Sequence, residues 1–186
     1  FLLESVEGGN TRGRYSAIGI NPDLIWRCKN GKAEISKKNN TKLEFIEEKL
    51  NPIESLKRII SLSYIDLPKE LSPLAAGLFG YLGYDMVSYF ENLQLNDLDP
   101  LNLPESILIR PSLICIFDRL NDEFKLITPI RPEKNISSKE AWSEGQKRLD
   151  RAIKELNVGL VHTNSPLEPN KISEFDAESN FQKEDY

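Results

Sequence analysis

Histidine and cysteine are scarce in this sequence, and their scarcity argues against several kinds of site. The 186 residues include one histidine, His162, and two cysteines, Cys28 and Cys115. His162 falls in a polar stretch that resembles a linker, which disfavours a triad of nucleophile, histidine base and carboxylate. Two cysteines make neither a disulfide framework nor a zinc site, and both are expected to be buried free thiols. No His, Cys, Asp and Glu cluster has metal-ligand spacing.

Long hydrophobic runs are also missing. No stretch approaches the roughly 18 apolar residues of a membrane-spanning helix, and no basic segment precedes an apolar one as in a signal peptide. A cytoplasmic protein without a membrane contact is therefore expected. The net charge of −5 gives no electrostatic reason to expect a nucleic-acid partner.

Glycine gathers in one place, Gly77 to Gly83, but without a nucleotide-binding pattern. The segment lacks the Gly-Lys-Ser/Thr ending of a P-loop and the spacing of a dinucleotide fingerprint. Glycine on a strand also permits close backbone packing, and this is the interpretation that the segment favours.

Strand and helix signals predict an α+β fold: antiparallel sheets forming a sandwich-like core, flanked by helices. Asn30-Gly31 is a hairpin signal, Asn51-Pro52 starts a helix, and Ser137-x-x-Glu140 is a capping box. The expected strands are a buried one at Leu2, Leu3 and Val6, and further ones at 15–20, 24–28, 32–36, 73–81, 112–117 and 123–128, with turns at 21–23 and 118–122. A short helix is expected from Met86.

Both tryptophans are expected in or near the core. Trp26 lies in a predicted strand. Trp142 lies on the helix that the capping box opens, on one face with Leu149, Ile153 and Leu156.

Polar side chains gather at the ends of the first two predicted strands. Glu4 and Ser5 follow the first strand, and Arg14 and Tyr15 begin the second. One interpretation is an ion pair between Glu4 and Arg14, with Ser5 as a spacer. The other is a site for an amino acid, because a carboxylate holds an ammonium group while a hydroxyl or guanidinium holds a carboxylate.

Several segments, in order along the chain, resemble anthranilate synthase component I, a family within the superfamily of chorismate-utilising enzymes. The likeness covers nearly the whole chain. The segments are Phe1-Leu2-Leu3-Glu4-Ser5, Gly13-Arg14-Tyr15-Ser16, Ile18-Gly19, the stretch from Gly77 to Asp85, Ile114-Cys115-Ile116-Phe117-Asp118, Ser179-Asn180-Phe181 and Glu184-Asp185-Tyr186.

The resemblance implies an enzyme that converts chorismate and ammonia to anthranilate and pyruvate with Mg²⁺. It also implies a glutamine amidotransferase partner, anthranilate synthase component II, and feedback inhibition by L-tryptophan. The residues it assigns to the L-tryptophan site are Ser5, Glu4, Arg14 and Tyr15. It assigns no catalytic residue and no metal ligand to this chain, since the chorismate and Mg²⁺ sites are expected beyond Tyr186.

The same resemblance divides the chain into three parts. Residues 1–157 would be the N-terminal regulatory lobe, 158–178 a linker, and 179–186 the start of the catalytic domain. The chain by itself is then expected to be inactive. Two alternatives remain open: the same lobe of aminodeoxychorismate synthase component I, and a stand-alone amino-acid-binding module.

Overall fold

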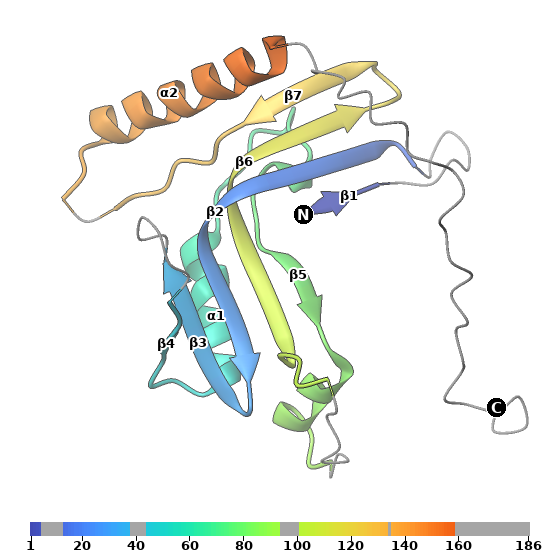
Figure 1. Cartoon of the computed structure of the whole chain (residues 1–186), viewed down its shortest axis with the longest axis vertical. Helices are drawn as coiled ribbons and strands as arrows, with labels where there is room; N and C mark the ends of the chain where they lie inside the picture. The colour runs from blue at the N-terminus through green and yellow to red at the C-terminus, as the bar shows by residue number, and fades with distance from the viewer. Residues whose placement is uncertain (5–12, 38–43, 94–100, 134, 159–186) are drawn as a thin grey trace, which may run out of the picture.

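A bent antiparallel sheet with two helices forms the described part of the molecule, which comprises residues 1–4, 13–37, 44–93, 101–133 and 135–158 of this computed structural model (Figure 1). Within these ranges seven strands pair in the order β4-β3-β2-β6-β5, with β1 against β2 and β7 against β6. The predicted α+β class is confirmed. The strands are β1 (Leu2–Leu3), β2 (Tyr15–Lys29), β3 (Lys32–Lys37), β4 (Ile46–Glu47), β5 (Phe79–Leu82), β6 (Ser106–Asp118) and β7 (Glu123–Ile127). The helices are α1 (Pro52–Ser63) and α2 (Ser138–Asn157), with 3₁₀ turns η1 (Pro73–Ala75) and η2 (Tyr84–Tyr89).

Two long strands, β2 and β6, run through the whole sheet and divide it into two halves. They pair from Tyr15 opposite Asp118 to Cys28 opposite Ser106. The turn predicted at 21–23 is wrong, because the chain continues through this point as one strand with a register shift between Pro22 and Leu24. Asn21 absorbs the irregularity with a φ of 50°, and such bulges bend a strand without ending it.

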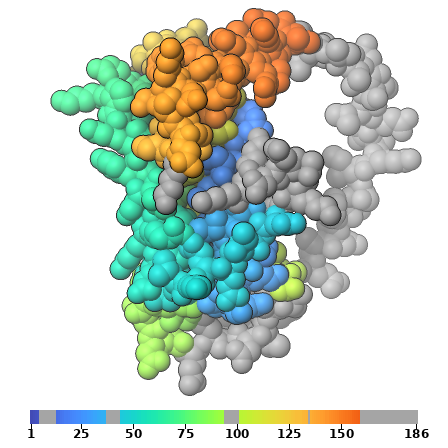
Figure 2. Space-filling model, turned by 90° about the vertical axis from the view of Figure 1, so that its left-hand side faces the viewer, coloured from blue at the N-terminus to red at the C-terminus, as the bar shows by residue number. Residues whose placement is uncertain are grey.

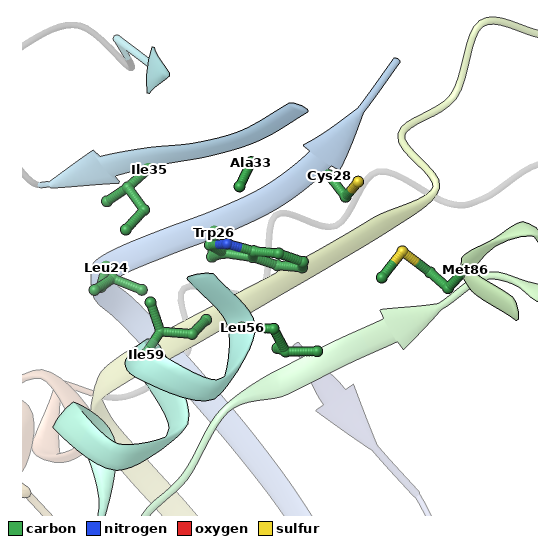
Figure 3. Packing of buried hydrophobic residues seen from close by; sticks show 8 residues of the cluster. All are labelled: Leu24, Trp26, Cys28, Ala33, Ile35, Leu56, Ile59 and Met86. Atoms are coloured by element: carbon green, nitrogen blue, oxygen red, sulfur yellow. The ribbon is translucent and has the colours of Figure 1, made fainter. Parts of the chain in front are cut away.

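The half of the sheet that carries β3, β4 and β5 is covered by α1. Asn51 caps the helix as predicted, its side chain accepting a hydrogen bond from the Glu54 amide. Figure 3 shows Leu56 and Ile59 of α1 pointing toward Trp26 of β2, which has no exposed surface. The indole Nε1–H donates to Ser55 Oγ across 2.8 Å, so the core position predicted for Trp26 is confirmed.

The half of the sheet that carries β1 and β7 has a second, smaller core. Ala17, Ile114 and Ile116 are buried there against Ala75 of η1. The strand predicted at 73–81 is wrong over its first part: Ser72 caps a 3₁₀ turn, and the strand is limited to Phe79–Leu82. Leu2 and Leu3 form the predicted strand, but their side chains are exposed, and Val6 lies outside the described residues.

The helix α2 forms one end of the molecule, shown in orange in Figure 2. Its predicted capping box is confirmed, with Ser137 and Glu140 bonded to each other's backbone N–H. The core position predicted for Trp142 is wrong, since 62% of this residue is exposed. Gly145 explains the orientation: a Cβ there would lie 2.7 Å from Cδ1 of Ile130, so the helix approaches the sheet through its small residues. None of the helices in the described ranges is long and apolar enough to cross a membrane.

The two cysteines are free thiols. Cys28 is buried as predicted, and burial raises the pKa of its thiol to about 11. Cys115 is only half-buried, and burial raises its pKa as well. Neither thiol is therefore activated as a thiolate nucleophile near pH 7.

Candidate functional site

Three of the four residues predicted for the site lie at one end of the β1–β2 pair. Leu2 and Leu3 pair with Ile18 and Ala17, so Glu4 follows β1 at the end where β2 begins. Glu4 is exposed, and both Arg14 and Tyr15 are half-buried. The antiparallel pairing thus brings together segments separated in the sequence by a loop. Ser5 lies outside the described residues.

Arg14 is held by a carboxylate that sequence reasoning did not assign to the site. Its Nε lies 2.9 Å from Oδ1 of Asp118, and its terminal nitrogen lies 2.6 Å from Oδ2. The pair is bidentate, the geometry that guanidinium and carboxylate groups favour. The hypothesis of a Glu4–Arg14 ion pair is therefore corrected: Arg14 joins the start of β2 to the end of β6.

Further hydrogen bonds hold Asp118 in place. Its carboxylate also accepts from the Leu120 amide and from the Asn121 side chain, each at 3.1 Å. The side-chain contact with Arg14, with a smaller contribution from the Leu120 amide, lowers the pKa of Asp118 to about 2, although burial of the carboxylate acts in the opposite direction. The sequence predicted a strand that ends in Asp118. It did not show that Asp118 pairs with Arg14, because the two residues lie 104 positions apart.

This pair gives the protein a predictable sensitivity to acid. Because the folded-state pKa of Asp118 is depressed below its ordinary value near 4, its stabilising contribution is present above that value and is lost as the pH falls from about 4 to about 2. We expect Asp118→Asn to lower the free energy of unfolding at pH 7 and to flatten its dependence on pH in this window. Urea unfolding between pH 2 and pH 7 measures both, with Asp66→Asn at an exposed position as the control. An unchanged pH dependence in Asp118→Asn would contradict the assignment.

Beside the strand ends lies an open apolar face of the sheet, which we define by Leu2, Ile18, Ile20, Phe117 and Phe124. Opposite partners in a sheet share a face, and the pairs Leu2–Ile18 and Phe117–Phe124 connect these side chains. Each is between 39% and 58% exposed. The second core lies on the other side, because its residues alternate with these along β2 and β6.

Ser16 lies opposite Phe117 and so shares this face. Its buried Oγ has no hydrogen-bond partner within the part of the chain that the structure describes. The sequence showed Ser16 next to Tyr15 but gave no sign that its hydroxyl would be unpaired. An apolar surface bordered by a carboxylate and a hydroxyl suits a small ligand with an apolar side chain and a charged head.

A separate apolar pocket of about 470 Å³ lies between α1 and β5, lined among others by Ile60, Leu78 and Leu82. Glu4, Arg14 and Tyr15 are not part of its lining, so it is distinct from the predicted site. Over the described ranges, no three His, Cys, Asp or Glu side chains come together as a metal site.

The fold is known from a solved structure. The crystal structure of anthranilate synthase component I from Streptococcus pneumoniae matches with a TM-score of 0.61 and 21% identity, over 83% of this chain and 32% of that chain. The fold is therefore of the anthranilate synthase component I type. No protein-family model matches the sequence.

Curated relatives confirm the resemblance that the motifs predicted. Anthranilate synthase component 1 of Cereibacter sphaeroides is 39% identical over 158 residues, which are 84% of this chain and 32% of the relative. The protein of the same name from Acetivibrio thermocellus is 33% identical over 190 residues, which are 100% of this chain and 37% of the relative. The chain is thus a relative of anthranilate synthase component I, and it spans about a third of the length of the relatives it matches.

Proposed function

We propose that this chain is the N-terminal, tryptophan-sensing portion of an anthranilate synthase component I. The whole enzyme would convert chorismate and ammonia to anthranilate and pyruvate, with Mg²⁺ bound outside the described residues and ammonia supplied by a glutamine amidotransferase subunit. The observation that carries the proposal is the strand-end cluster beside an open apolar face, in a chain related to this family over 84% of its length or more.

The geometry supports a division of roles within the tryptophan site. Glu4 is exposed at the end of β1 and offers a carboxylate to the ammonium group of the ligand. Arg14 is engaged by Asp118 and lies over the Tyr15 ring, 4.7 Å from its centroid, so it acts first as a clamp that fixes the start of β2. The open apolar face offers a surface for the indole ring. Ser5 would complete the head-group contacts.

Tryptophan bound here would inhibit only if it bound one arrangement of the enzyme more tightly than another. A coupling of about 1–3 kcal/mol changes affinity roughly 5- to 150-fold, and that is enough for feedback control. A site at the edge of an uncovered sheet face is suited to this role, because whatever covers the face would also touch the ligand.

The first experiment is an activity assay on the gene product from its source cells. Chorismate, Mg²⁺ and ammonium are supplied, and anthranilate is detected by its fluorescence, with L-tryptophan titrated in and L-phenylalanine as the control. We expect anthranilate formation that tryptophan inhibits selectively. Formation of 4-amino-4-deoxychorismate in place of anthranilate would assign the chain to the sister enzyme. An intact mass near 21.2 kDa without activity would favour the stand-alone binding module.

Replacing the carboxylate at the end of β1 tests the site itself. We expect Glu4→Gln to raise the tryptophan concentration for half-inhibition about tenfold without changing chorismate turnover, because a charge-assisted hydrogen bond contributes about 1.5 kcal/mol or more. Ser5→Phe should relieve inhibition further by filling the predicted head-group space. Glu91→Gln, at another exposed carboxylate, is the matched control. Tryptophan inhibition that is unchanged in both site variants would rule out this location.

A further inference from the structure

Large apolar side chains line the side of α2 next to the buried residues Gly145 and Ala152. Trp142, Ile153 and Leu156 are 62%, 47% and 58% exposed, and Leu149 between them is half-buried. Their spacing of three, four and seven residues places all four on one helix face. We name these four residues the Trp142 stripe.

The apolar side of α2 is wider than its contact with the rest of the fold. A surface helix usually buries its large apolar residues against the core, but the buried residues of α2 are Gly145 and Ala152, which lie beside the stripe. Arg148 fixes this orientation by donating from one terminal nitrogen to Thr128 Oγ1 at 2.6 Å and to the Ser112 carbonyl at 3.1 Å. The large residues therefore stay partly exposed within the described ranges, and the helix cannot turn to bury them without breaking these bonds.

We propose that the Trp142 stripe is the docking surface for the catalytic portion of the same polypeptide. This inference rests on the proposed function, which places that portion after α2. The chain matches only 32% and 37% of the length of two relatives, so most of a full synthase lies elsewhere in its sequence. A stretch tethered to α2 reaches the stripe at a high effective concentration, and a modest apolar contact is then sufficient.

The composition and size of the stripe agree with a tethered occupant. Tryptophan is a frequent anchor of interfaces; Trp142 lies at the N-terminal end of the stripe, and Lys139, Gln146 and Asp150 supply exposed polar neighbours. A stable dimer buries about 800 Å² on each partner. Four side chains that are already partly covered fall well short of that area, which disfavours a second copy as the occupant.

Tryptophan fluorescence tests the proposal directly in the gene product from its source cells. The difference between the wild type and Trp142→Phe isolates the emission of Trp142 and removes that of Trp26 and of any further tryptophan. We expect the emission of Trp142 to be blue-shifted and to lose most acrylamide quenching relative to N-acetyltryptophanamide. The protein should show this shielding at a molecular mass that corresponds to a monomer. Full quenching of Trp142 would overturn the proposal. Shielding that disappears on dilution, or that arises only on adding the amidotransferase, would assign the surface to another partner and would also overturn it.

A second pair of variants separates docking from simple destabilisation of α2. Trp142→Glu places a charge in the stripe, and Ser143→Glu places the same charge on the neighbouring exposed position. We expect a lower thermal midpoint only in Trp142→Glu, together with exposure of the stripe to proteases. Anthranilate formation is measured on the same preparations. If the enzyme forms anthranilate but acrylamide quenches Trp142 fully, the docking surface is overturned and the proposed activity stands. If Trp142 is shielded but no anthranilate forms, the proposed activity is overturned and the docking surface stands.

Discussion

Replacing Gly80 with alanine should destabilise the protein by about 3 kcal/mol or more. A Cβ at this position would lie 1.9 Å from the carbonyl oxygen of Ile107 on the neighbouring strand, and this backbone atom cannot rotate away. The φ of Gly80, 155°, is also one that other residues rarely adopt. A strained backbone and an overpacked contact each cost about 1–3 kcal/mol, so β5 must shift away from β6 to accommodate the methyl group.

Two neighbouring glycines provide controls that separate these two costs. Gly77 has a φ of 153°, but a Cβ there would meet nothing closer than 3.9 Å, so Gly77→Ala introduces the strain without the clash. Gly83 has an ordinary φ of −67°, yet its Cβ would lie 2.6 Å from the Glu105 carbonyl oxygen, so Gly83→Ala introduces the clash without the strain. Urea unfolding followed by fluorescence should rank Gly80→Ala as the most damaging. A Gly80→Ala variant as stable as Gly77→Ala would refute the close contact between the two backbones.

Truncating the two tryptophans should change the free energy of unfolding by very different amounts. We expect Trp26→Ala to cost about 3–5 kcal/mol, because its side chain has no exposed surface and leaves a large cavity. Trp142→Ala should change the free energy of unfolding of the 186-residue chain by less than about 0.5 kcal/mol, since this side chain is mostly exposed. Calorimetric unfolding of the two variants measures the difference.

The hydrogen bond to Trp26 sharpens this test. Ser55→Ala removes the acceptor of the indole Nε1–H and also the contact between Ser55 Oγ and Glu48. A buried donor without an acceptor costs about 1–3 kcal/mol. Ser55→Ala should therefore lower the free energy of unfolding by about this amount, although it removes only one oxygen atom. Equal destabilisation by Trp26→Ala and Trp142→Ala would show that α1 does not cover the sheet as described.

Local signals in the sequence predicted local structure well. The Asn51 cap, the Ser137–Glu140 box and the Asn30-Gly31 turn are each determined by a few adjacent residues, and the structure contains all three. Asn30 and Gly31 have the positive φ values, 51° and 75°, that such a turn requires. The α+β class follows from these elements and from the alternation of apolar residues along the strands.

The features that sequence reasoning missed depend on contacts between distant residues. Asn21-Pro22-Asp23 has the composition of a turn, but the pairing of β2 with β6 extends the chain through it. One interpretation of the sequence paired Arg14 with Glu4, the nearby acidic residue, whereas in the fold Arg14 pairs with Asp118. The sequence correctly placed the residues of the Trp142 stripe on one helix face. It did not show that Gly145 and Ala152 would be the buried residues of α2.

The pairing of β2 with β6 also sets a minimum time for folding during synthesis. The ion pair that joins their ends connects residues 104 positions apart, so β2 leaves the ribosome long before its main partner exists. At about 5–20 residues per second, the interval is roughly 5 to 20 s. The β2–β3 hairpin can form in that time, but the other edge of β2 stays unpaired and open to association with other chains. Rapid translation between residues 29 and 118, or a chaperone bound to the nascent chain, would reduce this exposure.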